Sequence, residues 1–197
     1  MKHLIGVYDY TVVLTYLSLF SAVIGQIQAG KGHLGFAVAC VAFSGLCDAF
    51  DGAVARTKKD RTEDEKSFGI QLDSLCDVIC FGVLPAYICC AMGVRGVLGV
   101  ALMFFYTACA VARLAFFNVL ETKRQQAEGG KNKFYRGLPV TSISIILPVF
   151  YLLGELIPQS KFVVVLYIML AVVGFLFVLD FRVRKPDWDR VLKLSHQ

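Results

Sequence analysis

Four aspartates stand in two closely spaced pairs in the first half of the chain. Asp48 and Asp51 are three residues apart, and Asp73 and Asp77 are four residues apart. Residues at these spacings lie on one face of a helix, so each pair is predicted to point to one side. Carboxylate oxygens are the ligands of hard divalent cations. The four side chains are therefore a candidate site for Mg2+ or Mn2+, with Ca2+ as the alternative.

The sequence on both sides of these pairs is strongly apolar. A carboxylate inside a membrane segment is costly, and four that converge repel one another unless cations lie between them. The structural alternative is a buried network of ion pairs. The apolar stretches hold too few basic residues to balance four aspartates, so the pattern predicts a metal site built into two membrane helices.

Such a site could act on a phosphorylated substrate. Two divalent ions held by carboxylates neutralise a diphosphate and stabilise the leaving group during in-line displacement. Gly52 and Gly69 would let a bulky ligand approach the backbone closely, and Arg56 would donate to a phosphate. An attacking alcohol also needs a proton acceptor. Asp77, the last of the four, is the candidate base on its position.

Composition places the chain in a membrane. Of its 197 residues, 57% are hydrophobic and only 18% are charged, which is unusual for a soluble domain. The net charge of +5 is too small and too scattered to indicate a nucleic-acid partner. The seven cysteines form no CxxC pair, and the three histidines lie outside the apolar stretches. We therefore expect no zinc site, no disulfide framework and no histidine-based catalysis.

The elements that must position the aspartates are apolar stretches of about 20 residues, the length that crosses a hydrocarbon core. Six such stretches predict an all-α integral membrane protein with six transmembrane helices, and Pro85 and Pro148 predict kinks in two of them. We expect one domain over residues 1–197, with interfacial segments at 1–9 and 187–197 and no cleaved signal peptide. The stretches cover residues 10–28, 34–55, 68–92, 97–120, 138–157 and 162–181.

The basic residues predict the orientation. Five follow each of the second, fourth and sixth stretches, whereas each of the other three connections holds one. The positive-inside rule then places both termini in the cytoplasm, in a multi-pass protein of the cytoplasmic membrane. The four aspartates would lie within roughly 7 to 16 Å of the cytoplasmic ends of their helices. The site is expected to open toward the cytoplasm, near lipid headgroups.

The whole pattern is D-x2-D-G-x2-A-R, a linker, and G-x3-D-x3-D. It resembles the signature of the CDP-alcohol phosphotransferase family. The resemblance implies six transmembrane helices, a homodimer, two divalent metal ions at the aspartates, Asp77 as the base, and a CDP-lipid whose cytidine packs near the glycines. Gly52, Ala55, Arg56 and Gly69 would then contact CDP. The matching positions are Asp48, Asp51, Gly52, Ala55, Arg56, Gly69, Asp73 and Asp77.

Three shorter stretches look like the phosphatidylserine synthase branch of that family: residues 72–86, residues 112–118 and residues 137–139. This branch implies transfer of a phosphatidyl group from CDP-diacylglycerol to L-serine, with release of CMP. Phe116 departs from the branch, and the linker at residues 57–68 is longer than usual and is expected to be a solvated turn. These departures bear on the acceptor more than on the reaction.

Serine carries a carboxylate, which an arginine would bind. Arg113, inside the fourth stretch, and Arg136, just before the fifth, are the candidates; the alternative is that they reach toward lipid phosphate. Asn118 is predicted to form a hydrogen bond between helices.

The same residues are compatible with other functions. The acceptor could instead be glycerol 3-phosphate or an inositol phosphate, and the donor could be an archaeal CDP-lipid. Intramembrane carboxylates also mark ion or proton transporters. Here they gather on one side of the membrane, and no polar residues continue toward the other side.

Overall fold

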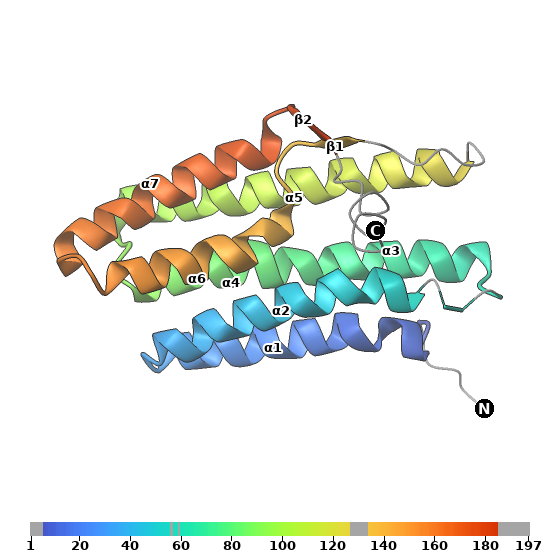
Figure 1. Cartoon of the computed structure of the whole chain (residues 1–197), viewed down its shortest axis with the longest axis horizontal. Coiled ribbons are helices and arrows are strands. Elements are labelled where there is room, and N and C mark those ends of the chain that lie inside the picture. The colour runs from blue at the N-terminus through green and yellow to red at the C-terminus, as the bar shows by residue number, and fades with distance from the viewer. Residues whose placement is uncertain (1–5, 56, 59, 127–133, 185–197) are drawn as a thin grey trace, which may run out of the picture.

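The computed structural model describes residues 6–55, 57–58, 60–126 and 134–184. In this part of the chain the helices lie side by side in an elongated bundle (Figure 1). Two three-residue strands accompany them. In chain order the elements are η1 (Tyr10–Val12), α1 (Val13–Gly30), α2 (Leu34–Ala55), α3 (Glu63–Asp77), η2 (Val78–Val83), α4 (Leu84–Ala91), α5 (Gly96–Gln126), β1 (Phe134–Arg136), η3 (Val140–Ser142), α6 (Ile143–Gly154), α7 (Gln159–Val178) and β2 (Arg182–Arg184).

The predicted helical membrane architecture is confirmed. Among the described residues, five helices are long and apolar enough to cross a membrane, and a sixth, Val140–Gly154, is apolar but shorter. That helix corresponds to the predicted span at residues 138–157. The number of spans and their orientation stay predictions. The five long helices are Tyr10–Gly30, Leu34–Ala55, Glu63–Ala91, Gly96–Lys123 and Gln159–Val178.

Helix α3 begins earlier than its apolar stretch predicts. The hydroxyl of Thr62 accepts a hydrogen bond from the Glu65 backbone N–H at 3.2 Å, and the Glu65 carboxylate accepts one from the Thr62 N–H at 3.0 Å. This capping box pairs two of the free N–H groups at the helix start. Acidic residues in the first turn also suit the helix dipole. Helix α5 likewise continues past its apolar stretch, to Gln126.

The two strands were not predicted. Phe134 pairs with Arg184, Tyr135 with Val183 and Arg136 with Arg182, in antiparallel register. Helix α7 ends at Val178, and the extended backbone of Leu179 leads the chain toward β2. The predicted end of this helix at residue 181 is therefore wrong, because the helix ends at Val178. The chain turns at Gly137, whose φ of +73° favours glycine.

Helices α1 and α2 pack through small residues. The buried face of α1 includes Ser18, Ser21 and Gly25. Ser21 donates to the Cys40 carbonyl at 3.1 Å, and Ser44 donates to the Ser18 carbonyl at 3.1 Å. Small residues let membrane helices approach closely, and their hydroxyls bond across the contact. This packing fixes α2, which carries Asp48 and Asp51.

The third membrane helix changes its winding directly after Asp77. Residues Val78–Val83 form a π-helical segment that ends just before Pro85, where the sequence predicts a kink. Pro85 has no N–H, so it cannot bond the carbonyl of Phe81 four residues earlier. Instead Tyr106 of α5 donates its hydroxyl to that carbonyl at 2.6 Å, and Thr107 donates to the Gly82 carbonyl at 3.3 Å. Helix α5 thereby supports the segment that follows the site.

Candidate metal centre

Helices α2 and α3 bring three of the predicted aspartates together. Ligand oxygens of Asp48, Asp73 and Asp77 all lie within 4.8 Å of one another. Asp48 comes from the C-terminal half of α2, and the other two come from the last turns of α3. Because Mg2+ binds oxygens at about 2.0 to 2.1 Å, two ligands of one ion lie up to ~4 Å apart. The cluster can therefore hold a divalent ion with little adjustment.

Asp51 lies at the edge of this cluster. Its carboxyl group interacts with that of Asp73, although it is not within reach of all three other ligands. Asp73 thus lies close to both aspartates of α2. The arrangement places all four carboxylates in one continuous group, with Asp73 as the shared member.

The burial of these side chains is incomplete but substantial. Asp77 is only 7% exposed, and the other three aspartates are half-buried. The nearby lysines Lys58 and Lys66 pair with Asp9, Glu65 and Glu63 and not with these four carboxylates. Carboxylates this close to one another repel. An all-oxygen cluster of this kind fits a hard divalent ion.

The predicted CDP contacts fall around the same helix ends. Gly52 is exposed, directly after Asp51, and Ala55 is the last residue of α2. Arg56 lies outside the described residues. Gly69 stands one turn before Asp73 on α3, and a Cβ atom built on it would lie only 2.6 Å from Nη2 of Arg61. Arg61 belongs to no sequence motif, so its contact with Gly69 was not predicted.

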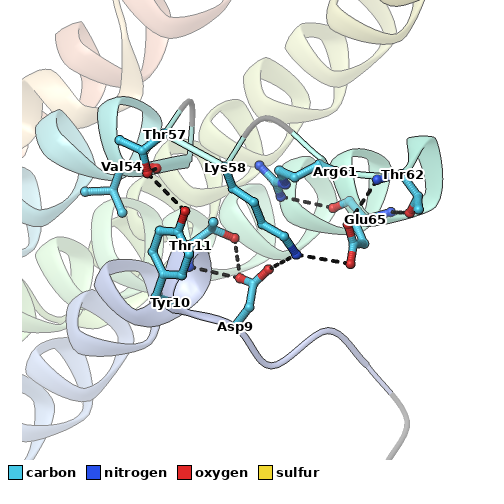
Figure 2. Close-up of polar contacts among 9 residues, drawn as sticks. All are labelled: Asp9, Tyr10, Thr11, Val54, Thr57, Lys58, Arg61, Thr62 and Glu65. Carbon is cyan, nitrogen blue, oxygen red and sulfur yellow. Dashed lines mark hydrogen bonds and ion pairs between the residues drawn. The ribbon is translucent and has the colours of Figure 1, made fainter.

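Several side chains in the described part of the linker between α2 and α3 form polar contacts, and the end of the predicted turn belongs to α3 from Glu63 onward. Figure 2 shows Lys58 between two carboxylates, with Nζ 2.8 Å from Asp9 Oδ2 and 3.3 Å from Glu65 Oε1. The hydrogen bond from Lys58 and those from Thr11 lower the pKa of Asp9 to about 2. Tyr10 and Thr57 are also hydrogen-bonded, at 3.2 Å. The start of η1 is therefore attached to the linker.

The two arginines that are predicted to bind the acceptor alcohol lie near each other in the structure. Arg113 is half-buried on α5, and its Nη1 would lie 3.4 Å from a Cβ atom built on Gly137. Arg136 belongs to β1, next to that glycine, and its side chain lies outside the described part. The structure thus brings the Arg113 guanidinium to the Gly-Leu-Pro stretch at residues 137–139.

The predicted hydrogen bond between helices at Asn118 is confirmed. Its Oδ1 accepts from Ser74 of α3 at 2.7 Å, and its Nδ2 donates to Gln71 Oε1 at 3.3 Å. Ser74 directly follows Asp73, so this contact fixes the turn of α3 that carries Asp73 against α5. A cavity of about 320 Å3 lies beside it, lined by Gln71, Asn118, Val119, Thr122 and Lys123.

A bundle of apolar helices with a carboxylate cluster between two of them defines a multi-pass membrane protein with an acidic cluster that could bind a metal ion. Residues 10–179 match the family model of CDP-alcohol phosphatidyltransferase, and the chain belongs to this family. The resemblance that the aspartate signature indicates is thereby confirmed.

Relatives in this family carry more specific names. The CDP-diacylglycerol–serine O-phosphatidyltransferase of Saccharomyces cerevisiae is 33% identical over 149 residues, 73% of this chain and 52% of the yeast protein. The archaetidylserine synthase of Methanothermobacter thermautotrophicus is 33% identical over 143 residues, 72% of this chain and 57% of that protein. A Helicobacter pylori protein with the same name as the yeast one is 33% identical over 114 residues, 57% of this chain and 46% of its own length. The chain spans about half the length of these curated relatives.

Proposed function

We propose that this protein transfers a phosphatidyl group from CDP-diacylglycerol to the hydroxyl of L-serine, giving phosphatidylserine and CMP. The observation that supports this most is the convergence of Asp48, Asp73 and Asp77 in a member of the CDP-alcohol phosphatidyltransferase family. The serine acceptor is supported by relatives that are named for serine. The reaction is metal-dependent in this proposal, with Mg2+ or Mn2+ as the ions.

The four aspartates would hold two divalent ions. When bound, such ions neutralise the diphosphate of the donor and the charge on departing CMP. The residues around them orient the reactants. Gly52, Ala55, Arg56 and Gly69 border the donor nucleotide, and Arg113 binds the serine carboxylate as a bidentate donor. Arg136 is the second candidate for that contact.

Asp77 acts as the base in this proposal. The serine oxygen forms a bond to the lipid-bearing phosphorus, the bond from that phosphorus to CMP breaks, and the serine hydroxyl proton passes to Asp77. Asp77 suits this role because it is the most buried of the four carboxylates. No separate nucleophile is needed for such a direct displacement.

The surroundings of the reaction belong to the same proposal. The protein would lie in the cytoplasmic membrane as a homodimer, in contact with membrane lipids, with both termini and the site facing the cytoplasm. The basic residues that follow alternate spans support this orientation. The aspartates would then meet a lipid donor at the headgroup level and serine from the cytoplasm.

An ether-linked donor is the alternative that a specific finding favours. One relative is named archaetidylserine synthase, and it covers as much of this chain as the yeast protein does. The side chains around the aspartates would contact the diphosphate, which acyl and ether donors share. Glycerol 3-phosphate and inositol phosphate remain the alternative acceptors.

One assay tests donor and acceptor together. Purified protein would receive CDP-diacylglycerol or its archaeal ether analogue with Mg2+ or Mn2+, and serine, glycerol 3-phosphate, inositol or inositol phosphate would be offered separately. We expect CMP release and a new lipid only with serine, and loss of both with EDTA. Turnover with another alcohol would overturn the acceptor assignment. No CMP release with any combination would overturn the proposed reaction.

A further inference from the structure

Arg61 is a cation beside the candidate site that lies outside the family signature. It stands in the linker between α2 and α3, two residues before the first turn of α3. Its guanidinium group packs against Gly69, where a Cβ atom would lie 2.6 Å from Nη2 and 3.7 Å from Cζ. Any side chain at position 69 would displace this group. In this chain the signature glycine therefore leaves room for an arginine.

The hydrogen bonding of this guanidinium is incomplete. Nη2 donates to the backbone carbonyl of Glu65 at 3.1 Å, as Figure 2 shows. Nε is buried and has no hydrogen-bond partner among the described residues. A buried N–H without a partner is unfavourable, and such groups are rare in native proteins. A small shift of the side chain toward a bound anion would give this N–H an acceptor.

The backbone before and after Arg61 is held in place by ion pairs and hydrogen bonds. Thr62 and Glu65 form the capping box that starts α3, and Lys58 holds Asp9 and Glu65 together. The backbone that carries Arg61 is therefore anchored. Gly69 and Asp73 are spaced i, i+4, so they share one face of α3 with a rise of about 6 Å between them, and the guanidinium packs against that face at Gly69.

We infer that Arg61 binds the diphosphate of the donor nucleotide, as a contact additional to the aspartates and the signature residues. A guanidinium edge matches two phosphate oxygens, and its charge complements an anion that divalent ions neutralise only in part. This inference rests on the proposed function, because it requires a CDP-lipid at the site. The competing role is purely structural, with Arg61 serving only to bond the Glu65 carbonyl.

The first test compares Arg61→Ala and Arg61→Lys with Lys66→Ala. Lys66→Ala is a matched control because it removes one positive charge from the same region. Lys66 pairs with exposed Glu63 at 2.7 Å. We expect Arg61→Ala to raise the KM for CDP-diacylglycerol by roughly 10-fold or more, with the KM for serine nearly unchanged. Arg61→Lys keeps the positive charge but loses the two parallel N–H donors of the guanidinium. Its KM for CDP-diacylglycerol should therefore lie between those of the wild type and Arg61→Ala. Lys66→Ala should leave all constants within about 2-fold.

A binding measurement separates this role from a structural one. Calorimetric titration of CDP in the presence of Mn2+ should show weaker binding in Arg61→Ala and intermediate binding in Arg61→Lys. Gly69→Ala should also weaken CDP binding by displacing the guanidinium, and should cost less in an Arg61→Ala background. Equal CDP affinity in Arg61→Ala, Arg61→Lys and the wild type would overturn the inference, as would a Gly69→Ala effect that is the same in both backgrounds.

The two proposals fail differently. If the wild type releases CMP and Arg61→Ala has an unchanged KM for the donor, only the role of Arg61 is wrong. If the wild type neither binds CDP nor releases CMP with any acceptor, the proposed function is wrong, and the inference falls with it. Thermal unfolding of each variant shows that it is folded, and Arg61→Lys carries the test if Arg61→Ala is not.

Discussion

Asp77 combines the deepest burial in the cluster with a position that can serve both a metal ion and a reacting hydroxyl. Asparagine keeps the shape of the side chain but removes its charge and its ability to accept a proton. We expect Asp77→Asn to lower CMP release by about 100-fold or more, the scale of a lost general base. The measurement is serine-dependent CMP release at saturating Mn2+. Asp64→Asn, on the exposed first turn of α3, is the matched control and should retain activity. Substantial activity in Asp77→Asn would contradict the mechanism.

Asp9 offers a second prediction, which concerns pH. Its hydrogen bond from Lys58 lowers its pKa from 3.8 to about 2, so the folded protein favours the charged carboxylate. The contact therefore stabilises the fold above about pH 4 and is lost as the pH falls through about 2. Asp9→Asn should cost about 0.5 kcal/mol, or about 1 to 2 °C in melting temperature, at neutral pH. At pH 2 the variant and the wild type should melt together.

The control for Asp9 is another linker aspartate. Asp60 is exposed, and Asp60→Asn should leave the melting temperature unchanged at both pH values. Thermal unfolding of the detergent-solubilised protein is the measurement. A difference between Asp9→Asn and the wild type that persists at pH 2 would show that the charge of Asp9 is not the cause.

For individual residues, the sequence predicts which charged side chains share a helix face. It does not predict contacts between side chains that come together across a turn. Asp48, Asp73 and Asp77 follow from helical spacing and from the cost of carboxylates in apolar sequence. Arg61 does not, because its approach to Gly69 depends on the path of the linker. The path depends in turn on Lys58 and Asp9, which are far apart in the chain. Linker geometry of this kind carries no periodic signal.

The π-helical segment is the element whose stability matters most for the site, because it begins at Val78, directly after Asp77. Tyr106, which is fully buried, donates to the Phe81 carbonyl that Pro85 leaves unpaired. Tyr106→Phe removes that donor without changing the packing volume much, so it should destabilise the protein by about 1 to 3 kcal/mol. Thermal unfolding in detergent measures the effect.

A tyrosine of the neighbouring helix α4 provides the comparison for Tyr106→Phe. Tyr87 of α4 is 43% exposed, so Tyr87→Phe should change the melting temperature by much less. We also expect lower activity in Tyr106→Phe, since the segment positions the base. If the two variants melted at the same temperature, the hydrogen bond to Phe81 would not support the segment.

The positions of the helices follow from hydropathy, but several of their ends do not. Thr62 and Glu65 start α3 in polar sequence, where the capping box outweighs the lack of apolar residues. The strands at Phe134–Arg136 and Arg182–Arg184 depend on pairing between segments distant in the chain. Three residues are too few for a pattern of period two to be recognised.

At the scale of the whole molecule, composition predicts the membrane, whereas the packing within it depends on a few residues. Apolar side chains such as Phe20, Val97 and Phe104 are exposed on the bundle surface, where a bilayer would cover them. Because the helices are apolar on all sides, hydropathy does not tell which face meets another helix. Small and polar residues, such as Ser18 and Ser44 between α1 and α2, determine which faces pack together.

The sequence also predicts which end of the whole bundle faces the cytoplasm. The N-terminal end of α1 and the linker between α2 and α3 lie at the same end of the molecule, as their contacts and Figure 1 show. The basic residues near that end predict that it faces the cytoplasm. A fluorescent protein fused after Gln197 should therefore fluoresce, and alkaline phosphatase at the same place should be inactive. Phosphatase fused after Gly32 or Gly93, in the turns that follow α1 and α4, should be active. The reverse pattern would place the aspartates on the outer side, away from cytoplasmic serine, and would contradict both the orientation and the proposed route of the acceptor.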